Sequence, residues 1–495
     1  MRRELGIMST LRAEDRDAVD LRRGVRVNLL GYIVKAAHPV LFIWVIRQYG
    51  AAEFGLFTVA QVTVMLALRL CLIGIDKGLL WWIPRTTQEK EREAILPALM
   101  VVAVTSSVGA IVLGLVGAGL LQRWVGSAES AGSIPWMAAA LLPMAILEIF
   151  THSLLGKRRT EAQVVVREGI VPISQVVLAL VFYALGLKAV GLELSFVIAQ
   201  TIGAGAAGLF FRHGFRSSRW PQWHWQLPPS EMMRYAIPLW LAELLNTTLL
   251  RLDVFLLAHL SNPKTLGIYA AAAQIANVVR SIRQSFDPIV IAIFSQVGAE
   301  RNTERLVASF SRATSGVIWL QLPVGGFIIV FAPWLMELFG PGFEAGAPVL
   351  RILTAGWIIN GVLGLNGMII LGFGRGDIQL WNICFAIMVE TALLFWFIPV
   401  WGVSGAALAV AGGYFLHHVV QYYQARSLSH VNVYDLRVLR TVAIGCFAWL
   451  GSAAIWFLLN TMQQQLWRQV VVFGVFGLII LVGWLYTKAK DKQAA

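Results

Sequence analysis

The sequence predicts an all-α polytopic membrane protein with about 14 transmembrane helices, and three observations lead to that class. Of the 495 residues, 58% are hydrophobic and only 14% are charged, which is unlike a soluble domain. The apolar residues gather in fourteen stretches long enough to cross a bilayer. The cations gather between those stretches, so the net charge of +13 indicates membrane orientation and no nucleic-acid partner.

The predicted spans follow an arginine-rich N-terminal tail that lacks the features of a cleavable signal. They lie at 25–47, 54–75, 94–121, 134–156, 163–187, 189–211, 235–260, 267–297, 313–337, 346–373, 378–399, 401–423, 438–459 and 467–487. Loops rich in Lys and Arg alternate with loops that hold one such residue. By the positive-inside rule we expect both termini in the cytosol, and an even number of spans agrees with that.

An internal repeat predicts two parallel six-helix units around a central cavity. Gly55 and Gly267 lie near the starts of the second and eighth spans, 212 positions apart, and Asp76 and Asp287 lie 211 apart. Parallel repeats place a substrate site between the two halves. The predicted parts are a cytosolic tail at 1–24, six-helix lobes at 25–211 and 235–423, a cytosolic linker at 212–234, and an extra helix pair with a cytosolic tail at 424–495.

The eighth predicted span is apolar, yet it carries a polar stripe. About one third of the helix circumference holds Asn277, Arg280, Arg283, Gln284 and Asp287. A charge in hydrocarbon costs from about 2.5 to over 10 kcal/mol unless it faces protein or water, so the stripe indicates a polar cavity. Because its cations outnumber its acid, the cavity suits an anion. The alternative is a structural Arg–Asp pair that locks neighbouring helices.

Charged residues in other predicted spans extend this candidate site. Lys35 lies in the first span, Arg69 shares a face of the second span with Asp76, and the seventh span aligns two acids. The expected substrate-binding cations are Lys35, Arg69, Arg280 and Arg283. The expected coupling or polar cavity residues are Asp253, Asp287, Asn277 and Glu243.

We expect no catalytic residue, cofactor or metal site. The three cysteines all lie within apolar spans, which argues against disulfides and metal binding. His417 and His418 lack a clear set of further ligands and are interpreted as an interfacial pair. Glu148 and His152 lie one helical turn apart, where they can hydrogen-bond to each other or to neighbouring residues.

Several short motifs resemble those of bacterial polysaccharide flippases in the multidrug/oligosaccharidyl-lipid/polysaccharide exporter superfamily. They are LDVFLL at 252–257, GIYAAA at 267–272, LFGPGFE at 338–344, APVLRIL at 347–353, LGFGR at 371–375 and GVSGAA at 402–407. The resemblance covers most of 25–423 and implies two six-helix lobes around a V-shaped cavity with alternating access. By helix, the four expected cations are similar in placement to cavity cations of the lipid II flippase branch, where two extra C-terminal helices also occur.

The residues and the resemblance together predict a flippase for a glycan carried on polyprenyl diphosphate. Arg and Lys hold a diphosphate through charge-assisted hydrogen bonds, and a polar lumen replaces the water around sugar hydroxyls. The expected location is the bacterial cytoplasmic (inner) membrane. The expected partners are the polyprenyl-diphosphate-linked oligosaccharide, membrane lipids, and glycan polymerase and export proteins.

Two other function classes remain open at this stage. A cation-coupled multidrug exporter of the same superfamily needs an acidic lumen, whereas the first span offers Lys35 and His38. A membrane glycosyltransferase or polymerase needs a sizeable external loop with acids or arginines. The longest predicted outward loop, 121–133, holds only Arg123 and Glu129 as charged residues.

Overall fold

The structure is a computed structural model, and it describes residues 41–125, 128–157, 159–188, 190–215, 226–300, 303–459 and 465–494. Within these ranges the chain is helical and contains no β-strand, so the predicted all-α class is confirmed. Helices suit a chain that crosses lipid because they pair the backbone N–H and C=O groups within one segment.

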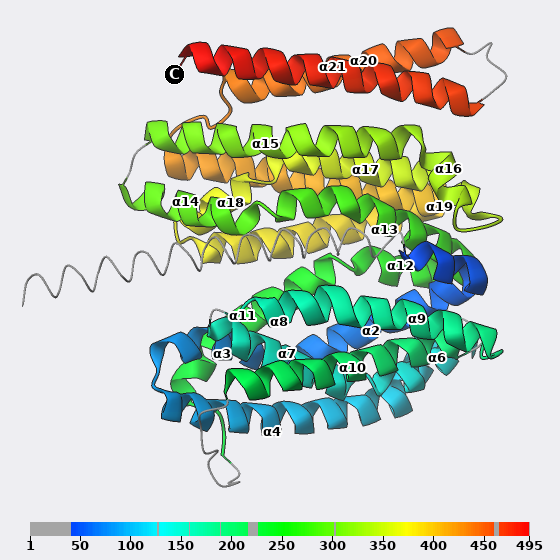
Figure 1. Cartoon of the computed structure of the whole chain (residues 1–495), viewed down its shortest axis with the longest axis vertical. Helices are drawn as coiled ribbons and strands as arrows, with labels where there is room; N and C mark the ends of the chain where they lie inside the picture. The colour runs from blue at the N-terminus through cyan, green and yellow to red at the C-terminus, as the bar shows by residue number, and fades with distance from the viewer. Residues whose placement is uncertain are drawn as a thin grey trace, which may run out of the picture. The chain divides into compact units, whose positions relative to one another are not determined.

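Contacts divide the chain into two compact units, between Thr248 and Leu249. A helical segment at 41–49 precedes the labelled helices of the first unit (Figure 1). Those elements are α2 (Ala51–Leu72), α3 (Ile75–Trp82), the 3₁₀ turn η1 (Ile83–Arg85), α4 (Gln88–Val112), the π-helix η2 (Leu113–Gly117), α5 (Ala118–Val125), α6 (Ala128–Ala138), α7 (Leu141–Gly156), α8 (Glu161–Gln163), the π-helix η3 (Val164–Ile170), α9 (Val171–Ala184), α10 (Gly191–Gly214) and α11 (Ser230–Leu249).

The second unit holds the remaining helices and the C-terminal pair. They are α12 (Leu252–Leu260), α13 (Pro263–Gln284), α14 (Asp287–Glu300), α15 (Thr303–Val330), α16 (Ala332–Glu337), the 3₁₀ turn η4 (Phe343–Gly346), α17 (Ala347–Leu363), α18 (Asn366–Gly372), α19 (Gly376–Ser429), α20 (Leu436–Leu458) and α21 (Gln465–Ala494). The pair α20 and α21 packs against α15 (Figure 1). Buried apolar side chains fill that contact, among them Leu322, Ala448 and Phe476.

Ten helices within the described residues are long and apolar enough to cross a membrane, so the predicted count of fourteen is not confirmed. One of the ten, α19, contains two predicted spans, 378–399 and 401–423. They are separated by a kink at Gly402, where φ is 56° and ψ is −133°. Only glycine adopts such a φ without strain, which explains a bend at this residue. The first predicted span, 25–47, lies mostly outside the described residues.

The seventh and eighth predicted spans were wrong as single helices. The seventh, 235–260, consists of two helices: α11 ends at Leu249, and α12 begins at Leu252. The eighth, 267–297, is interrupted between α13 and α14. Membrane proteins tolerate such breaks where the freed backbone groups face protein or a polar cavity. Discontinuous helices therefore mark the part of each unit where a polar site is found.

Two of the breaks recur at the spacing of the predicted repeat. Helices α2 and α13 each have 22 residues and start 212 positions apart. The helices that follow them, α3 and α14, begin at Ile75 and Asp287, again 212 positions apart. An internal repeat predicts such matching helix bounds, because the helix is then interrupted at the same place in each copy of the repeat.

Helix α11 packs in the first unit, against the break between α2 and α3. Gly74 has a φ of 75°, and a Cβ there would lie 2.5 Å from Ala236 O and 2.8 Å from Trp240 Cβ. The Trp240 indole Nε1 donates a hydrogen bond to Arg69 O at 2.7 Å. A residue without a side chain is thus required where α11 approaches. The predicted lobe limits at 25–211 and 235–423 stay a prediction.

Candidate functional site

The first unit gathers charged side chains where α2 ends. Ile73 and Gly74 take left-handed backbone angles, with φ of 48° and 75°, and the chain restarts as α3. The predicted continuous stripe through Arg69 and Asp76 is therefore interrupted. The two side chains still approach, with Arg69 Nη1 3.7 Å from Asp76 Oδ2.

Arg69 is shared by carboxylates from three helices. Besides Asp76 on α3, Glu148 on α7 lies 3.9 Å away and Glu243 on α11 lies 3.8 Å away. These distances are those of ion pairs and exceed hydrogen-bond length. The predicted cavity cation is thus surrounded by acids, and its positive charge is compensated within the unit.

Glu148 has a second and closer cation. Arg167 donates to both of its carboxylate oxygens, at 3.0 and 2.9 Å, which is the bidentate geometry of a strong pair. Arg167 lies in the π-helix η3, whose Val166 shares a buried apolar cluster with Leu147 of α7. π-Helical turns are rare and often occur at functional sites. Because Glu148 is only 4% exposed, the carboxylate of this pair is shielded from water.

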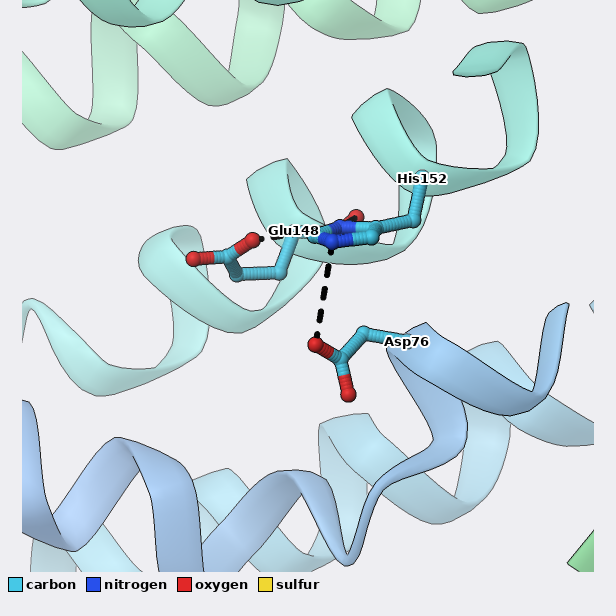
Figure 2. A group of neighbouring side chains, drawn as sticks. All are labelled: Asp76, Glu148 and His152. Atoms are coloured by element: carbon cyan, nitrogen blue, oxygen red, sulfur yellow. Dashed lines mark hydrogen bonds and ion pairs between the residues drawn. The ribbon is translucent and has the colours of Figure 1, made fainter. Parts of the chain in front are cut away.

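His152 lies beside Glu148 and Asp76, as Figure 2 shows. Its Nδ1 lies 2.9 Å from the backbone oxygen of Glu148 and 3.2 Å from the carboxylate, so the predicted contact between these two residues is confirmed. Its Nε2 lies 3.8 Å from Asp76 Oδ2. One oxygen or nitrogen atom from each of Asp76, Glu148 and His152 lies within 4.8 Å of the others, but Arg167 pairs with both oxygens of Glu148 and Arg69 lies beside Asp76, so the group does not suit a divalent cation.

In the second unit, the predicted polar stripe lies on both sides of the break between α13 and α14. Arg283 Nη1 donates to Asp287 Oδ1 at 3.0 Å, although Asp287 belongs to the next helix. This pair is the one that the structural alternative predicted. The Arg283 side chain is 11% exposed, and its Nε has no hydrogen-bond partner within the described residues.

Arg280 has different surroundings. Its guanidinium carbon lies 5.0 Å from the centre of the Trp357 ring, and Nη1 lies 3.5 Å from Asn277 Oδ1. With the Gln284 amide turned to accept, Arg280 Nε lies 3.2 Å from its oxygen. Within the part of the chain that the structure describes, no carboxylate lies at ion-pair distance from Arg280. At contact distance its partners are therefore an aromatic face and neutral amides, while Asp253, Asp287 and Glu390 act on its charge from farther away.

Asp253 is engaged by its own unit. Tyr269 Oη donates to Asp253 Oδ2 at 2.6 Å, and the backbone N–H of Val254 donates to Oδ1 at 2.8 Å. Tyr269 is fully buried. The sequence reasoning missed this tyrosine and also missed Glu390, which is 2% exposed in the middle of a predicted span. An acid within an apolar span was a sufficient signal for Glu390.

The interpretation of His417 and His418 as an interfacial pair was wrong, because each is only 6% exposed. His418 Nε2 lies 2.5 Å from Asn360 Nδ2, and its Nδ1 lies 2.8 Å from Gln421 Oε1. The contact with Asn360 links α17 to α19, and the contact with Gln421 lies within α19.

Of the other predicted cations, Lys35 lies outside the described residues.

Comparison with known proteins shows which family the sequence belongs to. A family model described as "Polysaccharide biosynthesis protein" matches residues 21–296, more than half of the chain. The chain belongs to that family. The teichuronic acid biosynthesis protein TuaB of Bacillus subtilis (strain 168) is 23% identical over 238 residues, which are 48% of each protein. The match thus spans about half the length of that curated relative.

Solved structures identify the fold of this family member. The lipid II flippase MurJ, in an inward closed conformation, aligns over 94% of this chain and 99% of its own, with a TM-score of 0.76 and 10% identity. A multidrug resistance MATE family transporter of the MOP superfamily, in an inward-facing conformation, aligns over 81% and 98%, with a TM-score of 0.65 and 16% identity. The chain is thus a multi-pass membrane protein with the fold of these transporters.

Proposed function

We propose that this protein is a flippase that moves a polyprenyl-diphosphate-linked glycan from the cytosolic to the outer leaflet of the bacterial inner membrane, for cell-surface polysaccharide synthesis. The observation that carries the proposal is Arg280, a cation with no carboxylate at ion-pair distance within the described residues. A guanidinium that no carboxylate pairs directly, in a chain with a transporter fold, suits a ligand that brings the negative charge.

Alternating access fits the proposed transport. The similar MurJ and MATE structures are in inward closed and inward-facing conformations, so this fold exists in more than one state in those proteins. In this chain, the helix breaks after α2 and α13 are points where such a change can be absorbed. Both termini are proposed to be cytosolic because the Lys- and Arg-rich loops share a side with them.

The proposed role of the protein is non-covalent. The diphosphate is held by charge-assisted hydrogen bonds from Arg280, and from Arg283 when it exchanges Asp287 for the ligand. Neutral donors such as Asn277 and Gln284 lie beside Arg280 and suit sugar or phosphate oxygens. Transport requires no bond to be made or broken, so no catalytic residue is assigned.

The proposal is tested by reconstituting the purified protein in vesicles that contain a labelled polyprenyl-diphosphate disaccharide. The label that becomes accessible to an added glycosidase reports flipping across the bilayer. We expect wild-type protein to expose the inner-leaflet lipid, and the Arg280→Ala variant to do so at least about tenfold more slowly, since a hydrogen bond to a charged group is worth about 1.5–3 kcal/mol.

Two comparisons in the same assay make the outcome decisive. A polyprenyl monophosphate with the same sugars carries less charge and should move more slowly. A lipophilic cationic drug should not be transported, which separates this function from that of a multidrug exporter. Exposure of the lipid at the rate of protein-free vesicles, or efflux of the drug instead, would contradict the proposal.

A further inference from the structure

The contact between His152 and Asp76, drawn in Figure 2, brings together two atoms that both accept hydrogen bonds when the imidazole is neutral. His152 Nδ1 faces two acceptors of Glu148, the backbone oxygen at 2.9 Å and a carboxylate oxygen at 3.2 Å. Both positions call for a donor, so Nδ1 carries the hydrogen in the neutral ring. The other ring nitrogen, Nε2, is then an acceptor. It faces Asp76 Oδ2, a second acceptor, at 3.8 Å.

The Asp76 oxygen is also unsatisfied. Asp76 is 2% exposed, and its Oδ2 has no hydrogen-bond partner within the described residues. A buried carboxylate oxygen without a donor is unfavourable. One proton added to His152 Nε2 turns two opposed acceptors into a donor and an acceptor, and it also creates an ion pair. No bond between heavy atoms changes in this step, and the proton comes from water.

Charged groups from several elements surround this contact. They are Arg69 on α2, Asp76 and Lys77 on α3, Glu148 on α7, Arg167 on η3 and, through Arg69, Glu243 on α11. Helix α4 also packs against α7, and its Glu91 pairs at 2.8 Å with Lys157, beyond His152 along the chain. Of the surrounding cations, Arg69 is the one that contacts three acids at once.

Arg69 is placed to leave this group. Its three ion pairs are 3.7, 3.9 and 3.8 Å long, and its side chain is 20% exposed. A diphosphate offers closer oxygens and more charge than any one of these acids. When the guanidinium turns away, Asp76 and Glu148 lose a positive neighbour, and protonation of His152 becomes more favourable because opposite charges stabilise one another.

We propose that His152 and Asp76 form a proton-binding site that takes up one proton when Arg69 turns to a diphosphate ligand. The second part of this proposal rests on the proposed function, and the first part does not. A metal ion fits the same group less well. Arg167 already donates to both oxygens of Glu148, and Arg69 lies beside Asp76, so a divalent cation would face two guanidinium groups.

The proton site is tested without any ligand. The full chain, labelled with ¹⁵N-histidine in nanodiscs, is titrated by NMR, and the His152 signal is identified by its loss in His152→Gln. Arg69→Gln imitates the departure of the guanidinium and should raise the proton affinity of His152 at least about tenfold. Arg69→Lys keeps the charge and should titrate like wild type.

A second variant tests the same site if Arg69→Gln does not fold. Asp76→Asn removes the charge that the imidazolium faces and should lower the proton affinity of His152 about tenfold. An unchanged His152 titration in either folded variant would overturn the proton site, whatever the transport activity of the protein.

The linkage to ligand is tested by calorimetry with inorganic pyrophosphate, in two buffers of different ionisation enthalpy. The difference in heat gives the number of protons taken up per pyrophosphate bound. Wild type should take up about one proton more than His152→Gln, and equal numbers would overturn the linkage. If pyrophosphate does not bind the wild type at all, the anion role in the proposed function fails with the linkage, while the ligand-free titration still decides the proton site.

Discussion

The two units break a helix at matching positions of the repeat, yet they surround the breaks with different charges. Arg69 and Arg280 lie 211 positions apart, each in the last turns of a 22-residue helix. Arg69 has acids from three helices within 4 Å. Arg280 has the Trp357 ring and neutral amides. Both units thus share the helix break, and the neighbouring side chains decide whether carboxylates lie close enough to balance the charge of the arginine.

That difference has an energetic consequence for anion binding. A compensated arginine must give up its ion pairs before it binds a ligand, so the net gain is small. Arg280 contacts an aromatic face and neutral amides, so a ligand displaces amide contacts and no directly paired acid. We therefore assign the main diphosphate contact to Arg280 of the second unit, and proton binding to the first.

The largest expected effect is on the free energy of unfolding, and it distinguishes the paired charges of the first unit from Arg280 of the second. Arg167→Ala leaves the buried carboxylate of Glu148 without its bidentate partner, which should cost about 3 kcal/mol of unfolding free energy. Arg280→Ala leaves no acid unpaired within the described residues and should cost less than about 1 kcal/mol. Unfolding of both variants in the same detergent measures the difference. Equal losses would remove the distinction between the units.

The next effect is on transport. Arg283→Ala removes a cation and leaves Asp287 unpaired, so export of the lipid-linked glycan should fall at least about tenfold. Asp287→Asn keeps the shape of the acid and releases Arg283 from its ion pair, which should preserve export. Rates are measured in vesicles at matched protein abundance. Normal export by Arg283→Ala would make the Arg283–Asp287 pair purely structural.

A smaller effect is expected from the hydrogen bond that holds Asp253. Tyr269→Phe removes the donor to Asp253 Oδ2 and should reduce stability by about 1 kcal/mol, because the acid is left partly unsatisfied. The neighbouring backbone donor at Val254 limits the loss. Thermal unfolding of the variant gives the value. A stability equal to wild type would show that Asp253 finds another partner.

The smallest effect is expected at Asn277. Asn277→Ala removes one neutral contact with Arg280, at 3.5 Å, and no charge. Export should fall no more than about fivefold, the value of an ordinary hydrogen bond. The same vesicle assay compares it with Arg280→Ala. A loss as large as that of the arginine variant would mean that Asn277 positions Arg280 and does not merely neighbour it.

The sequence predicted those features that depend on composition and on short spacing. Apolar length identified the membrane class, and the four-residue spacing of Arg283 and Asp287 anticipated their pair. The break between them was not predicted, although Pro288, the second residue of α14, was a signal for it, because proline lacks the N–H group that a continuous helix would need there. At the equivalent break in the first unit, Gly74 was such a signal.

Contacts between distant segments were beyond sequence reasoning. Glu148 and Arg167 are 19 residues apart, and their pairing depends on a π-helical stretch and a helix hairpin, neither of which has a sequence period. The three acids around Arg69 come from three helices, so only the packing of those helices could show that its charge is compensated.

The assignment of the diphosphate to Arg280 is tested most directly by the affinity of the purified protein for inorganic pyrophosphate at pH 7. Wild type, Arg69→Ala and Arg280→Ala are compared by calorimetry in one detergent. We predict that Arg280→Ala weakens binding at least about tenfold, and that Arg69→Ala weakens it no more than about threefold. The effect of Arg69→Ala is smaller because the ion pairs that Arg69 gives up offset most of the free energy that it gains from the ligand. Equal losses, or a larger loss for Arg69→Ala, would contradict the assignment.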